Sequence, residues 1–240
     1  MNIHALIKAA LYGMPIGAAA YLLSILLQQL ATKRREGTKI TWTDQCGKTI
    51  ERIPTEHKWV YILLAMLLMT AAALYTQSSY TQAFIMLELA LLLAVSIMDL
   101  KYRIIPNGFC FLIMIVKLAS MFTPYLVHLT PAVWPNLANS GIGLGMCFLV
   151  FFGGGILTGG KVGMGDVKLA MAVGFLLGWK DTLIAIALMG VLMMPFVFTV
   201  QGITLKTRFK QLVPMGPPLS LAAILVLIAG YSPLVQYMRF

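Results

Sequence analysis

Two aspartates in a largely apolar chain offer the clearest chemistry in the sequence. Asp99 lies in MDLKYRIIPN (98–107), and Asp166 lies in GMGD (163–166). Carboxylates at or inside membrane segments are costly, so they are candidates for function. Two neighbouring carboxylates do not both ionise easily, so one can act as a general base on water while its protonated partner acts as a general acid. Such a pair would hydrolyse an amide bond.

Each aspartate also has a purely structural interpretation. Asp166 precedes an apolar helical run, where a short acidic side chain commonly serves as the N-cap. Spacing alone favours the cap and the catalytic role equally, and the two roles are compatible. Asp99 lies close in sequence to Lys101 and Arg103, so an ion pair with one of them is the alternative for this residue.

The residues around the two aspartates predict the local backbone. Gly163 and Gly165 precede Asp166, and glycine permits both strained backbone angles and the close approach of another segment. Pro106 and Asn107 follow Asp99, and a Pro-Asn pair predicts a turn followed by a helix start. We therefore expect a tight backbone in front of Asp166 and a new helix beginning after Asp99.

The elements that must position these residues are predicted from composition. Of the 240 residues, 60% are hydrophobic and 11% are charged, with a mean hydropathy of +0.87, whereas soluble domains carry about 25% charged residues. We predict an all-α polytopic membrane protein with about eight transmembrane helices, because only helices and closed barrels satisfy their backbone in lipid and the runs lack the alternation of a barrel. The expected spans are 8–31, 58–76, 82–99, 107–128, 137–158, 166–180, 182–202 and 213–235. We expect a single transmembrane domain over 1–240, with a cytoplasmic loop at 32–57 and a catalytic core segment at 82–180.

The positive charges predict the orientation in the membrane. The chain has a net charge of +10, and fourteen of its 18 Lys and Arg residues fall in or at the edge of every second loop, namely 32–57, 100–106, 159–168 and 203–212. Cytoplasmic loops are the ones enriched in Lys and Arg. Both termini should therefore lie outside, and Asp99 and Asp166 should both lie at the cytoplasmic edge of the inner membrane. The charge follows loops and shows no aromatic interleaving, so no nucleic-acid partner is expected.

Several stretches together resemble the type IV prepilin peptidase family, the GxGD class of intramembrane aspartic proteases. MDLKYRIIPN is similar to the first aspartate motif of that family, and GMGDVKLAMAVGFLLGW (163–179) is similar to the second. GGG (153–155) and the proline-rich VPMGPPLSLAA (213–223) lie where the family has comparable segments. The resemblance covers about residues 85–230.

The resemblance implies a function and a set of site residues. The family cleaves short basic leaders from type IV prepilins or pseudopilins at the cytoplasmic membrane face, so the implied partners are such a substrate and the lipid bilayer. Asp99 and Asp166 would be the catalytic pair. The frame of the site would be formed by Gly163, Gly165, Lys168, Pro106 and Asn107. Lys168 is explained equally well as a positive-inside anchor.

The resemblance leaves a second activity open. Many members also methylate the new N-terminus with S-adenosylmethionine, and long members carry two CxxC pairs in the first cytoplasmic loop. Here that loop has only Cys46, in TDQCGKTIER (43–52), and one thiolate cannot complete a tetrahedral zinc site. We expect no metal and no cofactor for the peptidase reaction, with S-adenosylmethionine required only if methylation is retained.

Three other functions remain open at this point. Intramembrane carboxylates also bind ions in coupled transporters, although those sites usually lie near the bilayer midplane. A structural subunit of a pilus or secretion machine would not need either aspartate. A protease of this kind could also act on a different signal-bearing protein. The sequence does not indicate the oligomeric state.

Overall fold

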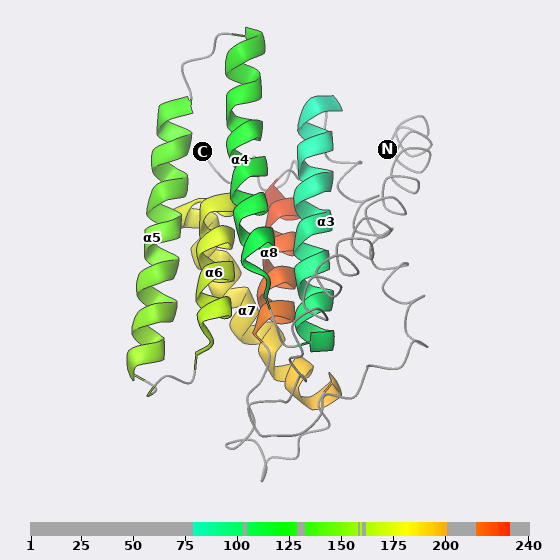
Figure 1. The fold of residues 1–240 in the computed structure, drawn as a ribbon, viewed down its shortest axis with the longest axis vertical. Helices are drawn as coiled ribbons and strands as arrows, with labels where there is room; N and C mark the ends of the chain where they lie inside the picture. Colours follow the sequence, from blue (N-terminus) through cyan, green and yellow to red (C-terminus); the bar gives the residue numbers. More distant parts are fainter. Residues whose placement is uncertain are drawn as a thin grey trace, which may run out of the picture. The chain divides into compact units, whose positions relative to one another are not determined.

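The computed structural model describes residues 79–102, 105–128, 133–157, 159, 162–200 and 215–230. This part of the chain is helical and contains no strand. Its helices are α3 (Ser79–Tyr102), α4 (Asn107–His128), α5 (Val133–Leu157), α6 (Met164–Leu177), α7 (Trp179–Val200) and α8 (Gly216–Gly230) (Figure 1). The all-α prediction is therefore confirmed for these residues.

The six helices overlap the last six predicted apolar segments, and their ends differ from the predicted ones by up to five residues. The two earlier segments, 8–31 and 58–76, lie outside the described residues, as do loops 32–57 and 203–212 and both termini. The prediction of eight membrane helices and the prediction of the outside termini consequently stay predictions.

Two of the helices are long and apolar enough to cross a membrane, at Ala83–Leu100 and Val133–Leu157. The exposed surface of α5 supports a membrane-spanning position for this helix. Leu149 and Leu157 are 72% and 89% exposed, whereas soluble proteins rarely present large contiguous apolar surfaces to water. These features agree with the prediction of a membrane protein.

The chain divides into two compact units, Met1–Ile104 with Gly230–Phe240, and Ile105–Ala229. In the first unit, α3 is apolar, and its Leu89, Leu92 and Val95 are fully buried. Two acidic side chains on this helix, Glu88 and Asp99, are buried as well. The prediction of a single transmembrane domain stays a prediction.

In the second unit, α6 is the central helix. It packs against α4, α5 and α7, and Figure 1 shows it running beside α5. Most of its side chains are buried, including Leu169, Val173 and Leu176. A helix that is apolar on all sides is suited to the interior of a bundle, so α6 holds a fixed position among its neighbours.

Helices α5 and α6 touch through their backbones at two glycines. A Cβ atom on Gly174 would run into the carbonyl oxygen of Gly143 and would come within 2.9 Å of the Cys147 sulfur. A Cβ on Gly143 would likewise strike the carbonyl oxygen of Gly174. Small residues allow such close helix contact in membranes, where packing rather than water exclusion drives association.

A glycine corner separates α6 from α7. Gly178 has a φ of +77°, and its N–H donates to the carbonyl oxygen of Gly174 at 3.0 Å. The next N–H, from Trp179, donates to Oδ1 of Asn139 on α5 at 3.3 Å. The hydroxyl of Thr182 donates to the Gly178 carbonyl oxygen at 2.6 Å. These contacts fix the break between α6 and α7 at Gly178, three residues before the break at 181 that the segments 166–180 and 182–202 predict.

Candidate active site

The first turn of α6 carries Asp166. The helix begins at Met164, and Gly163 is its N-cap, with φ −67° and ψ 138°. The carbonyl oxygen of Gly163 accepts a hydrogen bond from the N–H of Val167 at 3.2 Å. Asp166 is thus the third residue inside the helix, and its prediction as the N-cap is wrong because the helix starts earlier, on the extended backbone of Gly163.

The carboxylate of Asp166 lies back over the helix start. A Cβ on Gly163 would come within 3.0 Å of its Oδ2 atom. Asp166 is partly exposed, and a negative charge in the first turn interacts favourably with the helix dipole. Gly163 therefore leaves room for this carboxylate beside the first turn.

The two glycines of GMGD allow close contacts with neighbouring atoms and do not adopt unusual backbone angles. Gly163 has a negative φ, and Gly165 lies within α6. Among the described residues, the glycines with positive φ are Gly159 and Gly178. The predicted strained angles at Gly163 and Gly165 are wrong. The predicted close approach is confirmed at Gly165, where a Cβ would lie 3.3 Å from Cβ of Ile105.

The segment after Asp99 meets the segment around Asp166 at this point. Buried Ile105 covers Gly165, and α4 starts at Asn107 as predicted. The carbonyl oxygen of Pro106 accepts a hydrogen bond from the N–H of Phe109 at 3.1 Å, which closes the first turn of α4. The proline thus directs the chain from the Gly165 contact into the new helix.

A second contact joins the same two segments. Nζ of Lys168 donates a hydrogen bond to Oδ1 of Asn107 at 3.1 Å, across 61 positions of the sequence. Both side chains are exposed. The contact shows that Lys168 holds the start of α4, while its role as a positive-inside anchor stays a prediction. Ile105 was not among the predicted site residues, although its place directly before Pro106 in the first motif is a usable signal.

Asp99 lies near the end of α3 and is 4% exposed. It belongs to the first unit, whereas Asp166 belongs to the second. The pairing of the two carboxylates stays a prediction. The alternative ion pair of Asp99 also stays open, because the side chains of Lys101 and Arg103 lie outside the described ones.

The segment that carries both aspartates is similar to a known protein family. Residues 86–198 match the type IV leader peptidase family. The matched segment belongs to this family. It contains both aspartates and the Ile105–Asn107 segment, and it confirms the resemblance inferred from the motifs. The leader peptidase match supports a peptidase function. No curated protein and no solved structure matches the chain.

The described residues contain no group of three His, Cys, Asp or Glu side chains that could hold a metal ion. Cys110 and Cys147 are buried free thiols. Cys46 lies outside the described residues together with the rest of loop 32–57. The expectation that no metal is bound stays a prediction for the chain as a whole.

Proposed function

We propose that the chain is a membrane-embedded aspartic endopeptidase that removes the basic leader peptide from type IV prepilins or pseudopilins. The observation that carries the proposal is the contact between the two aspartate motifs. Ile105 packs on Gly165, and Asn107 binds Lys168, inside a segment that matches the leader peptidase family. The chain running on from Asp99 is thereby attached to the helix start that carries Asp166.

The proposed chemistry uses the two carboxyl groups and one water molecule. One ionised aspartate takes a proton from water, and the resulting hydroxide attacks the carbonyl carbon of the scissile bond. The protonated partner donates a hydrogen bond to the carbonyl oxygen and stabilises the negative charge that develops there. Collapse of the tetrahedral intermediate breaks the C–N bond, and the leaving amine takes up a proton. The products are the leader and a shortened pilin.

The location follows from the charge pattern of the loops. With the basic loops in the cytoplasm, α6 would run from Asp166 near the cytoplasmic side toward the outside. The substrate helix would lie in the membrane beside the enzyme, with its leader in the cytoplasm. This orientation is part of the proposal, as are the inner-membrane location and the outside termini.

A second step, N-methylation of the new terminus, stays a prediction. It would require S-adenosylmethionine as methyl donor. The loop that the family resemblance connects with this activity, 32–57, lies outside the described residues, and no described residue is assigned to that cofactor. An ion-coupled transporter is not supported by the family match, so we do not propose it.

A cleavage assay in membranes tests the peptidase. The chain is co-expressed with a tagged prepilin from the same genome, and the size shift of the prepilin is read for wild type, Asp99→Asn and Asp166→Asn. Asp181→Asn is the matched control, because Asp181 also lies in the first turn of a helix. Wild type and the control should cut, and both site variants should fail while remaining in the membrane. Cleavage by either site variant would exclude the aspartate pair.

A further inference from the structure

Helix α3 carries a second buried carboxyl group that the proposed reaction does not use. Glu88 is 3% exposed, and it lies inside the apolar span Ala83–Leu100. From the start of that span to Glu88 the helix rises about 8 Å. With α3 across the membrane, as the proposed function requires, the side chain therefore lies well inside the hydrocarbon region. A carboxyl group at such a depth is costly, which makes it a candidate for function.

Glu88 and Asp99 lie on one face of α3. The eleven residues from one to the other turn an α-helix by about 1,100°, which is about three turns plus 20°. Leu92 and Val95 lie between them at the same helical spacing, and both are fully buried. The two carboxyl groups thus mark the ends of one continuous buried stripe and are separated by about 16 Å along the helix axis.

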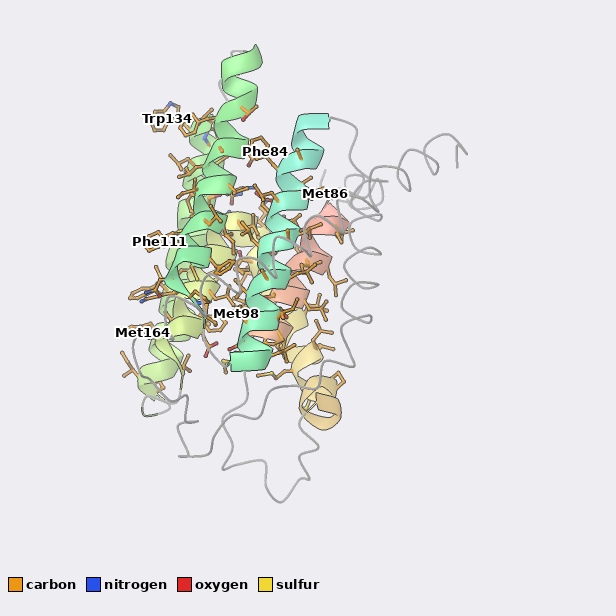
Figure 2. All side chains as sticks on the ribbon, turned by 45° about the vertical axis from the view of Figure 1, so that its right-hand side comes forward. Phe84, Met86, Met98, Phe111, Trp134 and Met164 are labelled. Atoms are coloured by element: carbon orange, nitrogen blue, oxygen red, sulfur yellow. The ribbon has the colours of Figure 1, made fainter. Side chains whose placement is uncertain are left out.

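The other faces of α3 do not distinguish one rotation of the helix from another. Ile85, Met86 and Leu91 are buried as well, and Figure 2 shows Met86 and Met98 on different sides of the helix. Because apolar side chains of similar size surround the axis, a rotated α3 would still bury an apolar surface. A buried polar group restricts such alternatives, since only one rotation brings it to its partner.

Glu88 meets the requirement for a fixed polar contact. It takes part in a hydrogen bond or electrostatic interaction. Within the described residues, the buried side-chain oxygen that lacks a hydrogen-bond partner belongs to Ser220 and not to Glu88. Asp99 cannot be a permanent anchor in the proposed reaction, because its carboxyl group must exchange hydrogen bonds with water and substrate. The permanent contact on this face is therefore the one at Glu88.

We propose that Glu88 is a positioning residue for Asp99. Its carboxyl group is hydrogen-bonded to a neighbouring part of the bundle, fixes the rotation of α3 and so sets the direction of the Asp99 side chain. A carboxyl group lies about 5 Å from the helix axis, so a rotation of about 20° displaces it by about 2 Å. Misplacement of a reacting group by about 1 Å can cost about a hundredfold in rate. The inference rests on the proposed function for the reacting role of Asp99.

Kinetics and stability of the purified protein in detergent test this role. Glu88→Leu removes the polar group and keeps a similar volume. Its kcat for a tagged prepilin should fall about tenfold or more, while KM stays within about twofold. Its melting temperature should be unchanged or higher, because apolar replacement of a buried polar group is often neutral or stabilising. Glu88→Gln keeps the hydrogen-bonding groups in place and should retain at least about a third of the rate. Met86→Leu, a volume-conserving change on another face, is the control and should cut normally.

A spectroscopic measurement tests the rotation of α3 without any cleavage. Ile97 lies on the side of α3 opposite to Glu88, and it is partly exposed. A nitroxide is attached at Ile97→Cys in a background of Cys46→Ser, Cys110→Ala and Cys147→Ala. The label should give a one-component spectrum with Glu88 or Glu88→Gln. Glu88→Leu should add a second component, because the helix then occupies more than one rotation.

An unchanged spectrum in Glu88→Leu would overturn the inference, whether or not the chain cleaves prepilin. Full cleavage by Glu88→Leu would overturn it as well, as would a fall in cleavage that only follows a fall in melting temperature. Equal losses in Glu88→Gln and Glu88→Leu would exclude the hydrogen bond as the cause. Glu88→Met takes the place of Glu88→Leu if that variant does not insert. A second spectral component in a chain whose wild type does not cut would contradict the peptidase and still support the fixed rotation.

Discussion

The two ends of α6 are held in opposite ways. At its C-terminal end, the backbone of Gly174 lies on Gly143, and a glycine corner bonded to Asn139 follows. At its N-terminal end, the contacts with α4 and the residues before it are made by side chains, with Ile105 on Gly165 and a hydrogen bond from exposed Lys168 to Asn107. The end that carries Asp166 is thus joined to its neighbour by side-chain contacts that can adjust, while the backbone contact at the far end is rigid.

The largest expected effect comes from the rigid end. Gly174→Val places side-chain atoms where the Gly143 carbonyl lies, so the helices must separate, at a cost of about 3 kcal/mol or more. Thermal unfolding in detergent should show a large loss of stability. Gly145→Val is the control, since nothing lies within 4 Å of a Cβ at that position and the helix propensities are the same. Equal losses in both variants would mean that the backbone contact contributes nothing.

At the N-terminal end of α6, a larger side chain should reduce activity and leave stability nearly unchanged. Gly165→Ala puts a methyl group 3.3 Å from Cβ of Ile105, so one of the two segments must shift by a few tenths of an ångström. We expect cleavage to fall about tenfold through misplacement of reacting groups, with the melting temperature nearly unchanged. Gly108→Ala, which meets open space, should cleave normally. Ile105→Ala should restore part of the activity of Gly165→Ala, and an absence of any rescue would contradict this contact.

A smaller effect is expected from the hydrogen bond at the same end. Lys168→Met removes the donor to Asn107 and should reduce cleavage about fivefold, which corresponds to about 1 kcal/mol. Lys168→Arg keeps a donor and should retain most activity, and Lys180→Met is the control on an exposed lysine elsewhere. Combining Lys168→Met with Asn107→Leu should cost less than the two single losses together. Additive losses would show that the contact has no effect on catalysis.

The smallest effect is expected at the corner that ends α6. Asn139→Ala removes the acceptor for the N–H of Trp179 and should lower the free energy of unfolding by about 0.5 to 1 kcal/mol. Cleavage by the folded protein should not change, because Asn139 lies at the far end from Asp166. A specific loss of cleavage at unchanged stability would show that the two ends of α6 are coupled.

The sequence predicted the helices better than their contacts. Apolar runs and the Pro106–Asn107 turn gave the helix positions to within a few residues, because burial in lipid or in a bundle requires such runs. The start of α6 was placed too late, since glycines are poor helix formers and Asp166 resembled a cap. The order of the two aspartate motifs was also readable, and it led to the leader peptidase family.

The register of α5 and α6 could not be read from the sequence. Many glycines lie in 141–178, and which of them face each other depends on how the helices cross. The contact of Ile105 with Gly165 has the same origin, because it joins segments that lie far apart along the chain. Whether Asp99 and Asp166 form one site depends on the distance between two units of the chain. No local sequence pattern determines such a distance.

The glycine corner at Gly178 is also a fixed point from which the position of Asp166 on α6 is set. From there, the count of residues back along α6 sets both the depth and the direction of the Asp166 carboxylate. One residue inserted between them would turn the carboxylate by about 100° around the helix axis and move it by about 1.5 Å. Four inserted residues would nearly restore its direction but carry it about 6 Å further from the corner. In the proposed peptidase, the length of this one short helix thus sets the depth of the Asp166 carboxylate in the membrane.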